Sequence, residues 1–287
     1  MSNSNQFDLR GRAVIVTGGA GMLGREYARA LARNGANVVV ADLDGELAET
    51  VAASINAGNA ATNAHTGAEG SRGTALGVKV DVSDQASVRQ LIQSTLDRFG
   101  RIDGLVNNAA LDPKFDQSQA GRHTSAFEDY PVELWARSLQ VNLTGMFLCA
   151  QAVAPAMLKQ ERGVIVNISS IYGLVGPDQR LYERDDPSAP RAFKPVDYSV
   201  TKSAVFGFTR YLAAYWAGRG IRVNTLTLGG VYNDHDAEFV RRYSDRAPLR
   251  RMAAKDEYCD SLLFLLSDAS SYMTGNNLVV DGGWTAW

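Results

Sequence analysis

The sequence has few cysteines. Cys149 and Cys259 are the only two among 287 residues, and each lies in an apolar run. Thiols this far apart do not indicate a disulfide framework or a clustered metal site, and we interpret both as reduced core residues. The three histidines, His65, His123 and His235, have no ligand spacing among themselves. We therefore expect no metal site.

An excess of charge of one sign is also missing. The chain has 29 Lys and Arg against 31 Asp and Glu, a formal net charge of -2. This balance excludes the electrostatic footprint of a nucleic-acid binder or a basic membrane-surface protein. The first ten residues are polar and no apolar run approaches the ~18 residues of a membrane span, so we expect neither a secretory signal nor a membrane partner. A cytoplasmic protein is the resulting expectation.

What the sequence does contain is a regular alternation of short β-branched runs and longer helical patterns. The expected strands are Ala13–Thr17, Asn37–Ala41, Leu76–Val80, Gly104–Val106, Val164–Ile168, Arg222–Leu226 and Asn277–Val280. The expected helices include Arg25–Asn34, Gln85–Phe99, Pro131–Gln160, Ser199–Ala217 and Lys255–Ser267. Near-continuous apolar strands separated by helices indicate parallel strands covered on both faces. We predict one α/β domain over residues 1–287, with a doubly wound parallel sheet.

Three segments interrupt this rhythm and are expected to be long loops: 52–73, 111–130 and 173–195. The last two follow strand ends, where ligands bind in open α/β sheets. They carry several arginines that suit an anionic ligand or, alternatively, are solvated loop charges balanced by nearby acids. These arginines are Arg122, Arg180, Arg184 and Arg191.

A glycine-rich turn follows the first expected strand. The segment Thr17–Gly24 reads Thr-Gly-Gly-Ala-Gly-Met-Leu-Gly and leads into a helix. Glycines at this point let the backbone approach a pyrophosphate, and the helix N-terminus offers N–H groups and partial positive charge. The strand–turn–helix context therefore predicts a dinucleotide site.

Asp42 ends the second expected strand, about 20 residues after the glycines. A carboxylate there suits the ribose hydroxyls of NAD and repels the extra phosphate of NADP. Neither Gly21 nor Leu43, the expected neighbours of that ribose, supplies a positive charge. We predict NAD rather than NADP, the alternative being that Asp42 is an ordinary turn residue. Asp81 and Val82 end the third strand and either meet the adenine or cap the next helix.

Tyr198 and Lys202 are four residues apart at the start of a helical segment, so they share one helix face. A nearby ammonium and the positive nicotinamide ring both stabilise a phenolate, and we expect Lys202 together with that ring to lower the pKa of Tyr198. Tyr198 is then a proton donor to a carbonyl or a base toward an alcohol. Ser170, at a strand end, either orients the substrate oxygen or forms a turn. Asn142 either binds a water that relays protons to Lys202 or is a hydrogen-bonded core amide.

These residues occur in the order typical of one family, and the chain resembles the classical short-chain dehydrogenases/reductases over about residues 9–284. The motifs that carry the resemblance are Thr17–Gly24, Asp81-Val82, Asn107-Asn108-Ala109-Ala110, Asn142, Ser170, Tyr198-Ser199-Val200-Thr201-Lys202 and Val280-Asp281-Gly282-Gly283. The resemblance implies a seven-stranded Rossmann sheet, a nicotinamide cofactor and self-association as a homotetramer or dimer. It places the catalytic tetrad on Asn142, Ser170, Tyr198 and Lys202.

The glycine turn and the resemblance together give a set of expected cofactor contacts. These are Gly18, Gly21, Met22, Leu23, Gly24, Asp42, Leu43, Asp81, Val82, Asn108, Ala109, Tyr198, Lys202, Gly229 and Val231. Expected substrate contacts are Tyr172 and the four loop arginines named above. The expected activity is NAD-dependent interconversion of a secondary alcohol and a ketone.

Departures from the family pattern bear on the substrate. Met22 replaces a usual glycine, and the glycines at 18, 21 and 24 instead follow the spacing of sugar-nucleotide-modifying members. An epimerase or dehydratase that retains its NAD, a general ketone reductase and a non-enzymatic NAD sensor are the alternatives, although a sensor needs no tetrad. The segments Gly121-Arg122-His123 and Ser170-Ile171-Tyr172-Gly173 resemble a bacterial subgroup associated with flagellin modification and nonulosonate sugars. This resemblance implies a polar carbohydrate substrate of surface-sugar biosynthesis.

Overall fold

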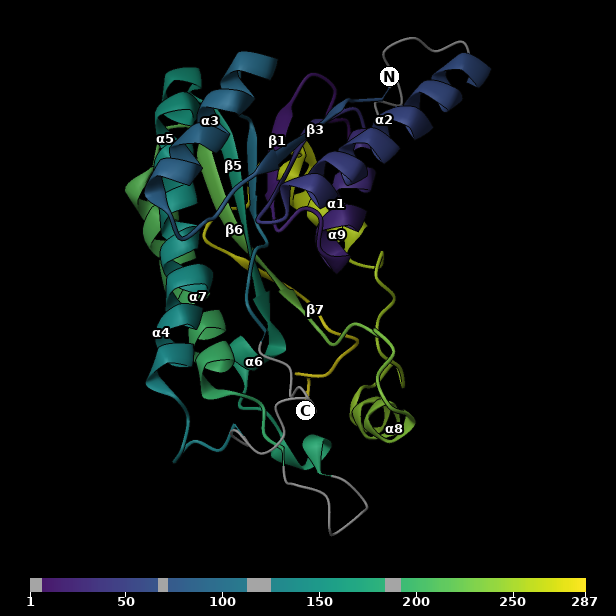
Figure 1. Cartoon of the computed structure of the whole chain (residues 1–287), viewed down its shortest axis with the longest axis vertical. Coiled ribbons are helices and arrows are strands. Elements are labelled where there is room, and N and C mark those ends of the chain that lie inside the picture. The colour runs from purple at the N-terminus through teal and green to yellow at the C-terminus, as the bar shows by residue number, and fades with distance from the viewer. Residues whose placement is uncertain (1–6, 67–71, 113–124, 184–191) are drawn as a thin grey trace.

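The computed structural model describes residues 7–66, 72–112, 125–183 and 192–287 (Figure 1). Its sheet has seven strands in the order β3-β2-β1-β4-β5-β6-β7, and every neighbouring pair is parallel. The strands are β1 (Ala13–Thr17), β2 (Asn37–Asp42), β3 (Ala75–Lys79), β4 (Gly104–Asn107), β5 (Gly163–Ser170), β6 (Ile221–Leu228) and β7 (Asn277–Val280). This confirms the predicted seven-stranded Rossmann-type sheet, in which the strand order reverses between β1 and β4.

Helices cover both faces of the sheet, as near-continuous apolar strands require. Figure 1 shows one layer on the right of the sheet, formed by α1 (Met22–Arg33), α2 (Gly45–Thr66) and α9 (Cys259–Leu266). The opposite layer contains α3 (Gln85–Phe99), α4 (Val132–Leu139), α5 (Gly145–Gln160) and α7 (Val196–Tyr215). Shorter elements lie near the carboxyl ends of the strands or after α9: α6 (Ile171–Leu174), η3 (Gln179–Tyr182), α8 (Ala237–Arg246) and η4 (Asp268–Ser270). Both cysteines are free and buried.

The expected loop at 52–73 is wrong for most of its length, because α2 continues to Thr66. Alanine, the best helix former, dominates this stretch and outweighs its glycine and asparagine content. Two of the asparagines serve the sheet edge instead of a turn. The Asn56 amide exchanges hydrogen bonds with the backbone of Ala75 in β3, at 2.9 and 2.7 Å, and Asn59 donates to the Gly73 carbonyl at 2.8 Å.

The expected helix Pro131–Gln160 is interrupted by a π-helical turn, η2 (Gln140–Thr144), between α4 and α5. Contrary to our expectation, the run Val132–Gln160 is long and apolar enough to cross a membrane by length and composition. Its apolarity has another explanation in the structure. Cys149, Val153 and Met157 pack with Leu105 and Ile165 of the sheet in one buried cluster.

The other two expected loops lie partly outside the described residues. The loop at 173–195 is not structureless where it is described, because it begins within α6 and contains η3. Asp178 makes that turn possible by accepting a hydrogen bond from the backbone N–H of Arg180. In the loop at 111–130, the described residues beside 113–124 form no helix or strand.

Candidate active site

A cavity of about 1500 Å³ opens where the strand order reverses, outside the carboxyl ends of β1, β4 and β5. The glycine turn after β1 forms one end of its wall. The start of α7, the end of β5 and the segment after β6 form the other end. This is where open α/β sheets bind their ligands.

Backbone geometry opens the glycine turn to the cavity. Gly18 has φ 60°, and a Cβ there would lie 2.9 Å from the Ala109 Cα. Gly21, the N-cap of α1, has no side chain to accept from the first helical turn, so this helix end faces the cavity uncovered. Gly24 does not line the cavity; a Cβ there would lie 2.0 Å from the Gly18 carbonyl oxygen. Its role is to let the helix approach the turn, and the cradle fits a pyrophosphate.

Thr17 and Asn108 hold the two central strands together beneath this turn. The Asn108 amide donates to the carbonyls of Thr17 and Gly18, at 2.9 and 3.1 Å. The Thr17 hydroxyl in turn accepts from the backbone N–H groups of Asn108 and Ala109, at 3.1 Å each. Asn108 is therefore placed to fix the shape of the turn. Thr17, which the sequence analysis named only as the first residue of the glycine-rich segment, contributes through its hydroxyl.

Asp42 and Leu43 line the cavity beside the glycine turn. One Asp42 carboxylate oxygen accepts from the Ala20 N–H at 3.0 Å, and the other accepts from the Asp44 N–H at 3.2 Å. Leu43 is 62% exposed, an apolar surface at the cavity edge. No Lys or Arg of the described cavity wall comes from the segments that hold Gly18, Gly21 and Asp42.

Asp81 and Val82 also line the cavity, after β3. Asp81 accepts from the backbone N–H and the hydroxyl of Ser83, at 2.9 and 2.6 Å, and so organises the turn. The helix cap of α3 is instead Asp84, which accepts from Ala86 and Ser87. Of the two roles that the sequence left open for Asp81, the helix cap therefore belongs to Asp84, and the adenine contact remains an expectation.

Tyr198 and Lys202 lie on the inner face of α7, and both line the cavity. The Lys202 ammonium donates to the Ile168 carbonyl of β5 at 3.0 Å and lies 5.8 Å from the Tyr198 ring centre. Burial lowers the pKa of Lys202 to about 8. The Lys202 ammonium alone does not produce the expected lowering of the Tyr198 pKa: burial, with a further contribution from the Asp112 carboxylate, raises it. Tyr198 is therefore held in its protonated form.

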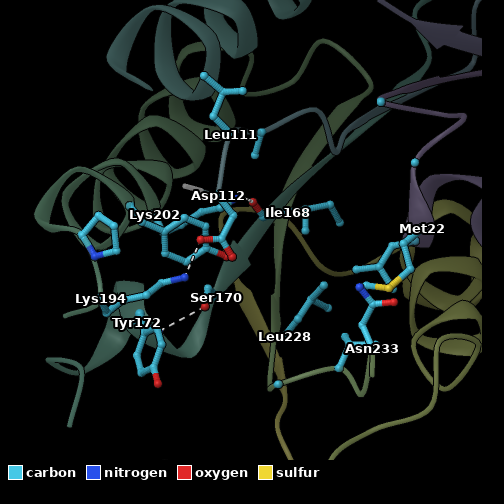
Figure 2. A pocket seen from close by; sticks show the side chains of 18 of the residues that line it. Met22, Leu111, Asp112, Ile168, Ser170, Tyr172, Lys194, Lys202, Leu228 and Asn233 are labelled. Carbon is cyan, nitrogen blue, oxygen red and sulfur yellow. Dashed lines mark hydrogen bonds and ion pairs between the residues drawn. The ribbon is translucent and has the colours of Figure 1, made fainter. Parts of the chain in front are cut away.

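The two serines at the end of β5 have different partners. The Ser169 hydroxyl donates to the Lys202 carbonyl at 2.8 Å and is occupied in fixing α7. The Ser170 hydroxyl is hydrogen-bonded to Tyr198, which opposes the rise in the Tyr198 pKa, and it accepts from the Tyr172 N–H at 3.3 Å. Ser170 is thus the serine brought together with Tyr198 and Lys202. Figure 2 shows Ser170 with its hydrogen bond to Tyr172.

Asn142 lies in the π-helical turn η2 and is 2% exposed. Its side chain accepts from the Leu111 N–H at 2.7 Å and donates to the Leu111 carbonyl at 2.9 Å. It also donates to the Thr201 hydroxyl at 3.2 Å. Asn142 therefore joins the chain after β4 to α7, one residue before Lys202, through a side chain whose hydrogen bonds are already used.

Sequence reasoning missed an ion pair in the cavity wall. The Lys194 ammonium binds the Asp112 carboxylate and lies 4.0 Å from the centre of the Tyr198 ring (Figure 2). The two residues are 82 positions apart, so no local spacing connects them. Topology connects them, because one follows β4 and the other precedes α7.

The segment after β6 forms the remaining wall. Gly229 and Val231 line the cavity, as does Asn233. The Gly229 carbonyl accepts from the Tyr258 hydroxyl at 3.1 Å, and Val231 pairs with Ala253 in an isolated parallel bridge. These contacts fix the backbone that the sequence analysis assigns to the cofactor.

The expected substrate contacts divide into three groups. Tyr172 lines the cavity, and its hydroxyl accepts from that of Tyr182 at 3.1 Å. Arg180 does not line it, because its guanidinium binds Asp178 at 2.7 and 2.8 Å and its side chain is 79% exposed. The expectation for Arg180 is therefore not supported by its position. Arg122, Arg184 and Arg191 lie outside the described residues.

Comparisons with known proteins extend over nearly the whole chain. The family model described as short chain dehydrogenase matches residues 12–182, and the one described as enoyl-(acyl carrier protein) reductase matches residues 190–285. The chain is 37% identical to trans-4-hydroxycyclohexanecarboxylate dehydrogenase of Sinomonas cyclohexanicum, covering 96% of this chain and 93% of that protein. It is 34% identical to D-threitol dehydrogenase of Mycolicibacterium smegmatis, covering 97% and 95%.

A solved structure of another dehydrogenase is similar in fold over nearly the whole chain. A gluconate 5-dehydrogenase from Burkholderia cenocepacia, in complex with NADP and tartrate, superposes with a TM-score of 0.81 at 30% identity, covering 99% of this chain and 98% of that one. None of the three relatives named here is described as acting in flagellin modification or on nonulosonate sugars.

Proposed function

The chain belongs to the short-chain dehydrogenase/reductase family and is an NAD(P)-dependent oxidoreductase acting on CH–OH groups, and from this premise we propose that it oxidises a secondary alcohol of a polar, polyhydroxylated substrate with NAD. One observation carries the proposal. Tyr198, Ser170 and Lys202 meet on one wall of the cavity whose other end is the glycine turn. The relatives named above act on polyols and cyclic alcohols, which supports a substrate of this class.

The roles of the three side chains follow from their surroundings. When bound in the cradle, the nicotinamide cofactor accepts or supplies the hydride. In reduction Tyr198, protonated because it is buried, donates its proton to the carbonyl oxygen. In oxidation it first releases that proton to solvent and then, as the phenolate, accepts the proton of the alcohol. Ser170, hydrogen-bonded to Tyr198, orients the substrate oxygen. The Lys202 ammonium holds the cofactor ribose and favours the phenolate.

Asn142 supports the reaction by holding other residues of the cavity wall in place. Its side-chain hydrogen bonds to Leu111 and Thr201 fix the wall beside Tyr198, so a water relay to Lys202 would have to use its backbone rather than its amide. We retain it in the catalytic tetrad as the residue that positions this wall.

Replacing Tyr198 with Phe tests the proposal. The substitution keeps the ring but removes the proton, so turnover should fall by about 10²–10⁴-fold. NAD affinity should change little, since the glycine turn and Lys202 remain. Tyr272→Phe is the matched control, because Tyr272 is fully exposed to solvent and does not line the cavity. Near-normal turnover of Tyr198→Phe would overturn the assignment.

We further propose that NAD is preferred to NADP. Asp42 lines the cavity, and a carboxylate there repels a ribose phosphate. NAD should bind at least about tenfold more tightly, and Asp42→Asn, which keeps the size and one acceptor, should narrow the gap by strengthening NADP binding. Calorimetric titration with both cofactors measures this. Equal or tighter NADP binding by the unaltered protein would contradict the proposal. The Burkholderia relative was solved with NADP bound, so the titration must include both cofactors.

A second candidate is a sugar-nucleotide epimerase or dehydratase, favoured by the glycine spacing 18-21-24. Such an enzyme keeps its NAD bound and produces no net NADH. Stoichiometric NADH formation from a free alcohol would exclude it. A substrate from bacterial surface-sugar biosynthesis is a narrower form of the leading proposal and rests on the loop motifs alone.

We also propose self-association as a homotetramer or dimer. Several large apolar side chains on the outer faces of α4, α5 and α7 are exposed to solvent in the single chain, which supports a covering partner. They are Val132, Phe147, Val200, Tyr211 and Tyr215. Light scattering after gel filtration tests the assembly, and a monomer at micromolar concentration would refute it.

A further inference from the structure

The Asp112–Lys194 ion pair lies directly beside the proposed reacting groups. The Lys194 ammonium is 4.0 Å from the Tyr198 ring centre and 5.8 Å from that of Tyr172. The Lys194 side chain is 11% exposed and that of Asp112 is 39% exposed, and both line the cavity (Figure 2). A substrate whose carbinol reaches Tyr198 must therefore place its neighbouring atoms close to both charges.

The chain does not need this pair to hold its shape, because each partner is anchored by other contacts. The Lys194 backbone N–H donates to the Gln179 side-chain oxygen at 2.9 Å. Next to Asp112 in the chain is Leu111, and the Asn142 side chain hydrogen-bonds both the N–H and the carbonyl of Leu111. Two separately fixed segments thus present an ammonium and a carboxylate to the same space. A preorganised arrangement of this kind is typical of a binding site.

The charges on the facing wall limit what can bind there. The segment between β6 and α8, which holds Asn233 in Figure 2, contributes Asp234 and Asp236 to the cavity lining. Glu238 lines it too and is paired with Arg242. Arg137 and Lys202 also line the cavity, but Lys202 donates to the Ile168 carbonyl and the segment after β6 contributes no Lys or Arg to the described lining. The wall that this segment forms is therefore less favourable for a carboxylate than for a neutral group, and Lys194 is already paired with Asp112.

We propose that Asp112 and Lys194 together recognise a neutral hydroxyl group on a carbon next to the reacting carbinol, so that the site selects polyols over hydroxy acids. A hydroxyl group is both a donor and an acceptor. It can accept from the Lys194 ammonium and donate to the Asp112 carboxylate, which leaves both charges satisfied. A carboxylate in the same place can only accept, and it would face Asp112 as a like charge.

This inference rests on the proposed alcohol oxidation and distinguishes two kinds of substrate for it, neutral polyols and hydroxy acids. Two of the relatives named above are named for hydroxy acids, 4-hydroxycyclohexanecarboxylate and gluconate, and one for threitol, a neutral polyol. The pair assigns this chain to neutral polyols.

The test compares threitol with threonate, and trans-cyclohexane-1,2-diol with trans-2-hydroxycyclohexanecarboxylate, by NADH formation. For the unaltered protein, kcat/KM should favour the neutral member of each pair by at least about tenfold, because like charges facing each other cost several kcal/mol. Asp112→Asn removes the negative charge but keeps the size, so the acids should gain at least about tenfold relative to the polyols, mainly through KM. Lys194→Gln should raise KM for the polyols more than it lowers kcat.

Asp8→Asn is the matched control. Like Asp112, Asp8 is in an ion pair, here with Arg10, and its side chain is 33% exposed, but it does not line the cavity. It should leave the preference unchanged. Thermal melts of both Asp112→Asn and Lys194→Gln establish that the variants are folded. An unaltered protein that prefers the acids, or an Asp112→Asn protein whose preference stays within about twofold, overturns the inference while alcohol oxidation stands. If the unaltered protein oxidises neither member of either pair nor any wider set of polyols and acids, the proposed function fails and this inference fails with it.

Discussion

Burying the Lys202 ammonium should cost folding stability, and replacing it with methionine should reveal how much. Its ordinary pKa of 10.5 falls to about 8, mainly because burial penalises the charged form; Lys194 adds to the fall and Asp112 opposes it. The difference between these pKa values corresponds to about 3 kcal/mol of native-state cost at neutral pH. Methionine has a similar length and no charge, but it leaves the Ile168 carbonyl without its donor, which costs about 1–3 kcal/mol.

The sign of the pH dependence separates these two contributions. Below about pH 8 Lys202 is charged in both the folded and the unfolded chain, so the native state bears the full cost. Above that pH the native state loses its proton while the unfolded chain keeps it. The stability of the unaltered protein should then rise with pH relative to Lys202→Met, by about 1.4 kcal/mol per pH unit. The lost hydrogen bond contributes a constant offset and does not change this slope.

Chemical unfolding of the cofactor-free proteins between about pH 7 and about pH 9.5 measures the effect. The unfolding free energy of the unaltered protein minus that of Lys202→Met should increase by about 2 kcal/mol over this range. Lys255→Met, which replaces a lysine already exposed to solvent, should give a flat difference. A flat difference for Lys202→Met as well would refute the view that this ammonium is held at a cost for its chemistry.

Three further tests concern the site's framework. Gly24→Ala should destabilise the chain by more than about 2 kcal/mol and weaken NAD binding, because its Cβ would lie 2.0 Å from a carbonyl oxygen. Gly58→Ala, whose Cβ would lie in open space within α2, should instead stabilise the chain by about 0.5–1 kcal/mol. Equal melting temperatures of the two variants would contradict this difference. Asn142→Ala removes the side chain that hydrogen-bonds the N–H and the carbonyl of Leu111, so the free energy of unfolding should fall by about 2–4 kcal/mol. A decrease of less than about 1 kcal/mol in chemical unfolding would refute this role. Arg180→Met should leave KM for polyols within about twofold, because its exposed guanidinium binds Asp178 outside the cavity; a larger rise in KM would return Arg180 to the substrate site.

The fold was predictable because its signals are local. Near-continuous runs such as Ala13–Thr17 are buried at every position, and the alternation with helices fixes a parallel sheet. The stretch from Ala52 to Thr66 was not predictable in the same way, because asparagine reads as a turn residue until its partner is known. Asn56 finds that partner in β3, about 19 residues further along the chain.

The site was predictable only where its residues share one element. Tyr198 and Lys202 lie one helical turn apart, so their spacing places them together. Asp112 and Lys194 come from separate loops, and only the crossover of the chain brings them into contact. The direction of the Tyr198 pKa could not be predicted either, because spacing reveals a neighbouring charge but not the burial that outweighs it.

The π-helical turn at Gln140–Thr144 sets the rotational phase between two helices. Its i→i+5 hydrogen bonding, seen where the Gly145 N–H reaches the Gln140 carbonyl, accommodates one residue more than an α-helical turn does. Each residue of an α-helix advances the direction of its side chain by about 100°. One residue inserted without a widened turn would rotate every later side chain by this angle. The widened turn absorbs most of that rotation, so the run takes up an extra residue while α4 keeps its contacts with α7 and α5 keeps its contacts with the sheet.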